Sequence, residues 1–267
     1  MSSASVKVVA ISGGSSGIGL ATAKLFVNRG WRVYNLSRRG TEEKRIIDIA
    51  TNVGDKATVK EAFARIKNQS GRLDLLITSA GYGISGAVEF TPLDQAKQQF
   101  DINFFGTLTC IQGSLPLLRE SKGRIICISS AAAVFAIPFQ AFYSASKAAV
   151  NILADGLANE LRQFGISVCA LQLGDVKTDF SKARVKTHSG DDLYRGAIGR
   201  SVAIMEQDEN KGMTPEVIAR AIYKIARHRK VRPLYTLGAK YKLFVLLNKL
   251  LPHSFVNHLI GKIYSGQ

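Results

Sequence analysis

The chain has 267 residues, of which 46% are hydrophobic, and its formal net charge is +16. This composition excludes a disordered chain, and no linker, low-complexity tract or internal repeat divides the sequence, so we expect a single domain over residues 1–267. The N-terminal residues contain no basic leader followed by an apolar stretch, which favours a cytoplasmic over a secreted protein. The three cysteines show no CxxC spacing and the four histidines have no metal-ligand spacing, so we expect buried, reduced thiols and no metal site.

The C-terminal segment is strongly basic. Residues 217–267 contain ten Lys or Arg and no Asp or Glu. Within this segment, residues 241–251 are amphipathic, but they are too short and too charged to cross a bilayer, which needs about 20 apolar residues. Two interpretations stay open: the segment packs on the domain or lines a pocket while its lysines face water, or it makes peripheral contact with an anionic membrane. No recognised reading motif accompanies the charge, so we expect no nucleic-acid partner.

The N-terminal region reads as a strand, a glycine-rich turn and a helix. An apolar run over residues 6–12 leads into Gly-Gly-Ser-Ser-Gly-Ile-Gly, helical spacing follows over residues 20–29, and residues 31–36 have the pattern of a second strand. Such a turn lets the pyrophosphate of a dinucleotide approach the free N–H groups at the start of the helix. The predicted ligands in this turn are Gly13, Ser15, Gly17, Ile18 and Gly19.

The end of the second predicted strand indicates which dinucleotide is bound. An acidic residue there would bind the ribose hydroxyls of NAD, whereas arginine suits the 2′-phosphate of NADP. The chain has Ser37, Arg38 and Arg39 at this point, and no carboxylate precedes them. We therefore predict NADP(H) as the cofactor. The alternative interpretation is a basic turn that faces solvent.

Further strands are predicted at residues 46–49, 73–78, 124–129 and 166–171, with helical patterns between them. This alternation predicts an α/β fold with a doubly wound parallel sheet of the Rossmann type. Ligands of such sheets bind beyond the carboxyl ends of the strands. The segments at those ends contain Ser79-Ala-Gly81 and Ser130, and Tyr143 and Lys147 follow Ser130 along the chain.

Tyr143 and Lys147 lie one helical turn apart and therefore share a helix face. We expect the ammonium group to stabilise the phenolate and to lower the pKa of Tyr143 below its usual value of about 10, so that the phenol can act as an acid or base. Ser130 can donate a hydrogen bond to a substrate oxygen that gains charge. A Tyr-x-x-x-Lys pair alone is common on helix surfaces; its position after a strand and a double serine favours a catalytic role.

Together these motifs resemble the short-chain dehydrogenases/reductases, over most of the chain up to about residue 180. The resemblance implies that Tyr143 transfers the proton, Ser130 orients the substrate and Lys147 binds ribose. It also implies that Asn103 supports a proton relay. Further cofactor contacts implied by the resemblance are Asp48, Ile49, Ser79, Ala80, Gly81, Val176 and Thr178. The chain departs from the family pattern at Thr78 and Ser79, where two asparagines are usual, and at Leu173, where proline is usual. These changes leave the catalytic group intact.

The substrate is less well defined by the sequence. Residues 179–213 are polar without strong periodicity, and we expect them to form a lid that is mobile until a ligand binds. Apolar side chains after two strands would enclose the substrate: Tyr82, Ile84, Val134, Phe135, Ile137 and Phe139. The chain is similar to the branch that contains 17β-hydroxysteroid dehydrogenases, retinol dehydrogenases and acyl-dihydroxyacetone-phosphate reductases, which implies a bulky hydrophobic ketone or alcohol. The alternative is that these apolar residues are ordinary core.

Two other functions are compatible with the same motifs. One is an NADPH-binding redox sensor that acts on a partner through residues 217–267, although a sensor has no need of the proton donor Tyr143. The other is a lipid-surface protein of reductase ancestry. The resemblance also implies a homo-oligomer built through the helices that contain Asn103 and Tyr143.

Overall fold

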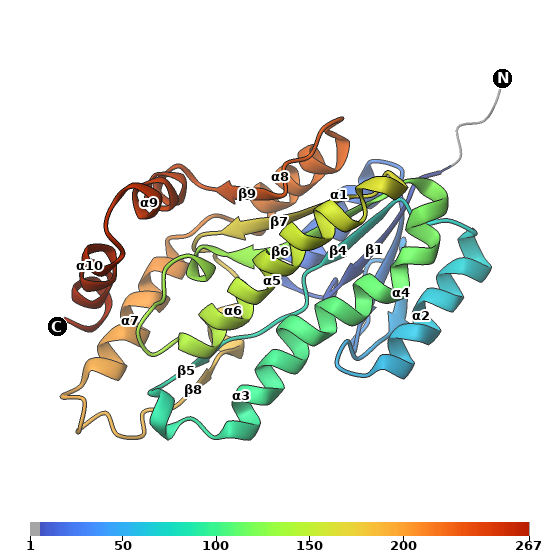
Figure 1. Cartoon of the computed structure of the whole chain (residues 1–267). Helices are drawn as coiled ribbons and strands as arrows, with labels where there is room; N and C mark the ends of the chain where they lie inside the picture. The colour runs from blue at the N-terminus through green and yellow to red at the C-terminus, as the bar shows by residue number, and fades with distance from the viewer. Residues whose placement is uncertain (1–5, 267) are drawn as a thin grey trace.

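The structure is a computed structural model that describes residues 6–266. Its centre is a seven-stranded sheet in which every pairing is parallel, with the strand order β3-β2-β1-β4-β6-β7-β9 (Figure 1). The strands are β1 (Val8–Ser12), β2 (Arg32–Ser37), β3 (Ile46–Ala50), β4 (Leu75–Thr78), β6 (Arg124–Ser130), β7 (Ser167–Leu173) and β9 (Leu234–Leu237). The predicted doubly wound Rossmann sheet is confirmed.

Helices cover both faces of this sheet. The helices are α1 (Gly17–Asn28) and α8 (Pro215–Arg227) on one face, and α2 (Lys56–Ser70), α4 (Gly106–Ser121) and α5 (Ala141–Glu160) on the other. Side chains alternate between the faces along each strand, so Val9 and Ile11 of β1 pack towards α1 and α8, whereas Val8 and Ala10 pack towards the opposite layer. Burial on both faces explains why the strands are rich in apolar residues and do not alternate strictly between apolar and polar ones.

The three cysteines confirm the sequence prediction. Cys110, Cys127 and Cys169 are free and buried in the two cores of the sheet. Burial raises the pKa of the Cys127 thiol to about 11 and those of the other two to about 12. They are unreactive packing residues, since the thiolate is the reactive form.

The sheet contains one strand that the sequence analysis did not predict. Strand β9 pairs with β7, and helix α8 before it buries Ile218 and Ile222 against α1. Strand β9 and all but the first two residues of α8 lie within the basic segment, residues 217–267. Residues 217–237 are therefore part of the Rossmann core. The short sequence of β9 is half-buried and gives no alternating pattern, which is why periodicity missed it.

The predicted lid contains regular structure. It comprises α6 (Phe180–Ala183), β8 (Val185–Lys186) and α7 (Ala197–Asn210), and β8 forms a two-stranded parallel sheet with β5 (Ile84–Ser85). Helix α7 buries Ile198, Val202 and Met205, which are spaced for one helix face. The weak overall periodicity of the segment concealed this stripe, because polar residues dominate the rest of α7.

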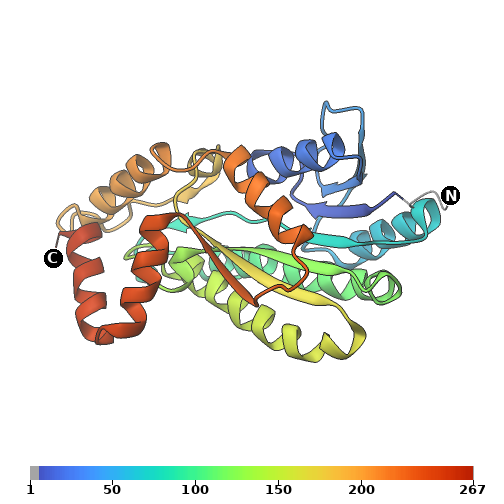
Figure 2. The ribbon, with the colours of Figure 1, turned by 90° about the horizontal axis from the view of Figure 1, so that it is seen from above.

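The chain ends in a helical hairpin made of α9 (Ala239–Leu250) and α10 (His253–Ser265), which two residues connect. Figures 1 and 2 show the two helices side by side at one end of the molecule, beyond β9 and next to α7. No helix within residues 6–266 is both long enough and apolar enough to cross a bilayer.

Candidate active site

The carboxyl ends of β1, β4, β6 and β7 meet at one edge of the sheet. The glycine-rich turn follows β1, residues 79–81 follow β4, Ser130 ends β6, and residues 174–178 follow β7. Helix α5 begins near this edge and carries Tyr143 in its first turn. Parallel pairing therefore brings together the sites that the sequence analysis selected on separate segments.

Close backbone packing makes the glycines of the first turn necessary. Gly13 has φ 71°, and a Cβ at this position would lie 2.8 Å from Cα of Ala80. A Cβ on Gly19 would lie 2.1 Å from the carbonyl oxygen of Gly13. The hydroxyl of Ser12 accepts hydrogen bonds from the amides of Ser79 and Ala80 at 3.2 and 3.3 Å. The β1 turn and the β4 loop thus form one rigid unit.

This turn meets the geometric requirements of a pyrophosphate site. Helix α1 begins at Gly17, three residues earlier than the spacing predicted, so Gly17, Ile18 and Gly19 form its first turn. Ser16 at the N-cap gives these residues no side-chain cap, and no acidic residue lies in the first turn. Uncapped N–H groups and the positive end of the helix dipole are what a phosphate binds. The residues present fit a dinucleotide.

The loop after β7 closes over the same turn. The Cγ2 atom of Thr178 lies 3.5 Å from the position that a Cβ on Gly17 would occupy. Val176 forms a bridge with Met213, and the amide of Lys177 donates to the Met213 carbonyl at 2.9 Å. Thr178 therefore lies beside the glycine-rich turn, and the contacts with Met213 fix the backbone of the loop at Val176 and Lys177.

The loop that follows β2 is organised by Asp48. Its carboxylate accepts hydrogen bonds from the side-chain amide of Asn35 at 2.7 Å and from the backbone amide of Thr41 at 2.9 Å. A carboxylate therefore lies beside the basic turn, which the local sequence did not reveal, although its charge is already engaged by these donors. The Ile49 side chain is buried in the core, so only its backbone is left to face a ligand.

The basic turn itself is exposed. The Ser37 hydroxyl donates to the carbonyl of Arg39 at 2.6 Å, which fixes the backbone of the turn. Arg38 and Arg39 are exposed, and none of the hydrogen bonds or ion pairs described for residues 6–266 involves their guanidinium groups. Two guanidinium groups at the end of β2 are suitably placed for an anionic ligand.

Tyr143, Ser130 and Lys147 lie around the ends of β6 and α5. The Ser130 hydroxyl accepts from the amide of Ala132 at 3.1 Å and also interacts with the Tyr143 phenol. The ammonium of Lys147 donates to the carbonyl of Ile128 at 3.0 Å and lies 5.8 Å from the centre of the Tyr143 ring. The predicted hydroxyl, phenol and ammonium are therefore neighbours.

Asn103 joins this group from the turn of π-helix over Asp101–Phe105, a distortion frequently found at functional sites. Its side chain is fully buried, donates to the carbonyl of Tyr82 at 3.0 Å and accepts from the Tyr82 amide at 3.0 Å. A Cβ on Gly81 would lie 3.0 Å from the Asn103 side-chain oxygen and 3.5 Å from the Lys147 nitrogen. Asn103 and Lys147 thus approach each other across Gly81.

Burial controls the protonation of these groups. It raises the pKa of Tyr143 to about 12, although the Ser130 hydrogen bond and the positive charge of Arg184 oppose this shift. Burial also lowers the pKa of Lys147 to about 8. The sequence prediction that Lys147 lowers the pKa of Tyr143 is wrong for this structure. Spacing along a helix showed that the two residues share a face, but it could not show that Lys147 is buried and that Tyr143 is half-buried.

Three residues beside Tyr143 carry no sequence motif: Phe180, Arg184 and Glu209. The Phe180 ring lies 5.7 Å from the Tyr143 ring, and the Arg184 guanidinium lies 5.6 Å from the Phe180 ring. The Arg184 side chain is fully buried and forms an ion pair with Glu209 of α7. All three belong to the predicted lid, where no motif marked them. Only the contact between distant parts of that segment reveals them.

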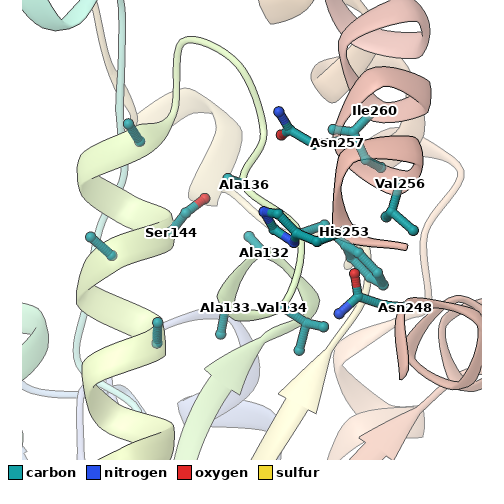
Figure 3. A pocket seen from close by; sticks show the side chains of 14 residues that line it. Ala132, Ala133, Val134, Ala136, Ser144, Asn248, His253, Val256, Asn257 and Ile260 are labelled. Atoms are coloured by element: carbon teal, nitrogen blue, oxygen red, sulfur yellow. The ribbon is translucent and has the colours of Figure 1, made fainter. Parts of the chain in front are cut away.

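The predicted apolar enclosure is divided between two places. Val134 and Phe135 line a cavity of about 290 Å³ between the start of α5 and the C-terminal hairpin (Figure 3). Ile84 is instead buried in β5, and the Phe139 ring packs edge to face against the Tyr194 ring, with 5.4 Å between the ring centres. The cavity adjoins the residues after Ser130, but its lining does not include Ser130 or Tyr143. Its far wall comes from α9 and α10: Asn248, His253, Val256, Asn257 and Ile260.

Comparison with known proteins agrees with this geometry. Residues 7–189 match the model of the short chain dehydrogenase family. The chain is 32% identical to a probable short-chain type dehydrogenase/reductase, VdlC, of Helicobacter pylori, with 96% of this chain and 97% of the relative covered. It is 34% identical to a 3-ketodihydrosphingosine reductase of Bacteroides thetaiotaomicron, with coverage of 97% and 98%.

Solved structures give the same result. A short-chain dehydrogenase from Streptomyces avermitilis superposes with a TM-score of 0.83 at 28% identity, covering 98% of this chain and 97% of that one. The structure of ElxO with NADP bound gives a TM-score of 0.75 at 25% identity, covering 89% and 99%. This chain belongs to the short-chain dehydrogenase/reductase family of oxidoreductases.

Proposed function

We propose that the protein is an NADP(H)-dependent oxidoreductase that reduces a bulky hydrophobic carbonyl compound to an alcohol. The observation that carries this proposal is the cluster of Ser130, Tyr143, Lys147 and Asn103 at the carboxyl edge of the sheet, beside an uncapped helix start. Family membership supports the oxidoreductase class. The cofactor preference, the residue roles and the substrate are the proposed details.

The roles of the residues follow from their donors and acceptors. When bound, the nicotinamide ring supplies the hydride that reduces the carbonyl carbon. Tyr143 gives its phenolic proton to the substrate oxygen, and its raised pKa keeps that proton in place at neutral pH. Ser130 donates a hydrogen bond to the same oxygen as negative charge develops there. Lys147 and Asn103, whose side chains both lie close to Gly81, would connect Tyr143 with solvent as a proton relay.

Two observations support NADP(H) over NAD(H). Arg38 and Arg39 are exposed at the end of β2, where a 2′-phosphate would bind, and the nearby carboxylate of Asp48 is engaged by internal donors. ElxO, which is similar in structure, was solved with NADP. We expect Ser15, Gly17 and Ile18 to bind the pyrophosphate through the first turn of α1, with Val176 and Thr178 over the nicotinamide.

The hydrophobic substrate class has separate support. The cavity beside the residues after Ser130 is lined mainly by small and apolar side chains, among them Ala132, Val134, Val256 and Ile260. The name of the Bacteroides relative specifies a keto substrate, in keeping with carbonyl reduction. A cytoplasmic location stays a prediction. So does a homo-oligomer, which the exposed apolar side chains of Phe105 and Ile152, near Asn103 and on α5, would favour.

The NADPH sensor is less well supported than the enzyme. The sensor would act on its partner through residues 217–267, but much of this segment is not free to do so, because α8 and β9 are part of the core. The acid/base residue that a sensor would not need is present and in contact with Ser130.

The test is the consumption of NADPH with a panel of hydrophobic and small polar ketones, with NADH and Tyr143→Phe as parallel controls. We expect turnover with NADPH and hydrophobic ketones, and a loss of on the order of 10²–10⁴-fold in the variant, which lacks the proton donor. Fluorescence titration should show that Tyr143→Phe still binds NADPH. Tight binding without turnover of any ketone would favour the sensor, and turnover of small polar ketones alone would contradict the proposed substrate class.

A further inference from the structure

The C-terminal hairpin exposes an unusual amount of apolar surface. In α9, Leu243, Leu246, Leu247 and Leu250 are 53%, 52%, 36% and 71% exposed. Their spacing of three and four residues puts them on one side of the helix. Helix α9 contains no buried residue at all, and α10 contains only Ser265.

A second apolar stripe begins in the connection after α9 and continues through α10. Leu251, Phe255, Leu259 and Ile263 recur every four residues and are 36%, 55%, 45% and 46% exposed. Monomeric proteins scatter exposed apolar residues singly, whereas a contiguous set marks a surface that contacts a partner or a membrane. We call the two stripes together the leucine surface of the hairpin.

The opposite side of the hairpin is attached to the protein. The Tyr241 hydroxyl donates to the carboxylate of Asp175, and the Phe244 ring packs against Phe135 at 6.2 Å between ring centres. At the other end, the Arg200 guanidinium donates to the carbonyl of Ser265 at 3.5 Å. The hairpin is therefore held on one side, and the leucine surface lies on its solvent-exposed sides.

The charge of the hairpin indicates which partner this surface fits. Lys240, Lys242, Lys249 and Lys262 are exposed, and the chain contains no Asp or Glu after residue 216. A helix with exposed leucines, flanking lysines and no acidic residue has the composition of segments that lie in the headgroup region of an anionic membrane. A second copy of the chain is a poorer fit, because a twofold contact would bring the same cationic surface against itself.

We infer that the α9–α10 hairpin binds the surface of an anionic lipid bilayer, with the leucine surface in the headgroup region and the lysines against the lipid phosphates. This function is independent of the reaction catalysed. It assigns a role to the part of the basic segment that the Rossmann core does not use. The hairpin is a surface anchor, since neither helix can cross a bilayer.

The test uses the full chain and vesicles of equal parts phosphatidylcholine and phosphatidylglycerol. Co-sedimentation should show binding to these vesicles and much weaker binding to pure phosphatidylcholine. The double variant Leu246→Glu, Leu250→Glu should lose binding. The matched control is Leu93→Glu, which changes a leucine that is 68% exposed on α3 (Leu93–Phe100), and it should bind like the wild type. Thermal unfolding of each variant checks that it is folded.

A variant that removes positive charge separates the electrostatic contribution to membrane binding from the contribution of the leucines. Each lysine near an anionic surface adds roughly fivefold to the binding constant, so Lys240→Gln, Lys242→Gln and Lys249→Gln together should weaken binding about a hundredfold, and the difference should shrink at high salt. The inference would be overturned if the wild-type protein does not bind anionic vesicles, or if the leucine variant still binds them. If light scattering instead shows a dimer that the leucine variant dissociates, and vesicles do not bind, a second copy covers this surface.

Discussion

The ammonium group of Lys147 donates a hydrogen bond to the carbonyl oxygen of Ile128 at 3.0 Å, within the layer between α5 and the sheet. One hydrogen bond replaces little of the water that an ammonium loses on burial, so the pKa of Lys147 falls from 10.5 to about 8. The folded protein therefore binds this proton less tightly than the unfolded chain does. Stability must then depend on pH through this residue.

We predict that the burial of Lys147 makes the free energy of unfolding lower at neutral pH than at pH 10.5. Between about pH 8 and pH 10.5 the unfolded chain is protonated at Lys147 and the folded protein is not, so stability rises with pH in this window. The full shift corresponds to about 3 kcal/mol at 1.36 kcal/mol per pKa unit. Urea unfolding of the wild type and of Lys147→Met, compared at both ends of the window, measures it.

Tyr143 also makes the free energy of unfolding depend on pH, in the opposite direction to Lys147. Because Tyr143 is present in both proteins, the difference between wild type and Lys147→Met removes its effect. The pKa of Tyr143 is raised from 10.0 to about 12, so its contribution to stability is lost as the pH rises from 10 to 12. A difference between wild type and Lys147→Met that is constant from pH 8 to 10.5 would contradict the burial of an ammonium at this site.

Gly13 offers a second test, because the chain contains a matched control. Gly13 and Gly30 both have left-handed backbones, with φ 71° and 78°. A Cβ on Gly13 would lie 2.8 Å from the Ala80 backbone, whereas a Cβ on Gly30 would meet nothing within 4 Å. Gly30→Ala should cost only the backbone strain of about 1–2 kcal/mol, and Gly13→Ala about 2–5 kcal/mol, since the contact adds to the strain.

The two alanine variants also differ in their expected ligand binding. Gly13→Ala should weaken NADPH binding because the turn and the β4 loop must separate, and Gly30→Ala should leave it unchanged. Chemical unfolding and fluorescence titration measure the two effects. Equal losses of stability in both variants would mean that the backbone at Ala80 moves away from the new methyl group with no loss of free energy of unfolding.

Much of this architecture could be predicted from the chain. Apolar runs located six of the seven strands of the large sheet, because a sheet that is buried on both faces leaves few polar positions in its strands. The glycine-rich turn and Ser130 were found because they lie at the carboxyl ends of predicted strands, which parallel pairing brings together, and Tyr143 and Lys147 because they come after Ser130 at helical spacing. These predictions depend on the periodicity of apolar residues and on the order of strands and helices, and both can be read from the spacing of residues in the sequence.

The remaining features depend on contacts between distant segments. Strand β9 is short and half-buried, so its four residues carry no pattern. Arg184 and Glu209 come together only because α6 and α7 fold against each other above Tyr143. The direction of the pKa shift of Tyr143 is set by the depth of burial, a property of the whole packed structure. Neither spacing nor composition could supply it.

The two arginines after β2 should determine the cofactor preference. Arg38→Ala and Arg39→Ala should each weaken NADPH binding by about tenfold to a hundredfold, the value of one or two charge-assisted hydrogen bonds, and should leave NADH binding unchanged. The wild-type affinity for NADPH should also fall with added salt, because both side chains are exposed. Parallel titrations with the two cofactors provide the measurement. An equal loss for NADH would assign these residues to loop structure.

The ion pair of Arg184 and Glu209 should adjust the acidity of Tyr143. The positive charge of Arg184 lowers the pKa of Tyr143, and the negative charge of Glu209 raises it. Arg184→Met should therefore raise the pKa further, and the double variant Arg184→Met, Glu209→Gln should return it towards the wild-type value. The double variant is also expected to be the more stable of the two, because the single variant leaves Glu209 without its buried partner.

Ultraviolet difference titration of phenolate formation measures this pKa without reliance on activity, with the spectrum of a matching Tyr143→Phe protein subtracted for each variant. The pH dependence of alcohol oxidation gives an independent value, since that direction requires the phenolate and its rate rises as Tyr143 ionises. Both curves should move to higher pH in Arg184→Met. If neither moves in a variant that is folded, Arg184 acts only as a structural link between α6 and α7, and the lid residues have no part in setting the proton affinity of Tyr143.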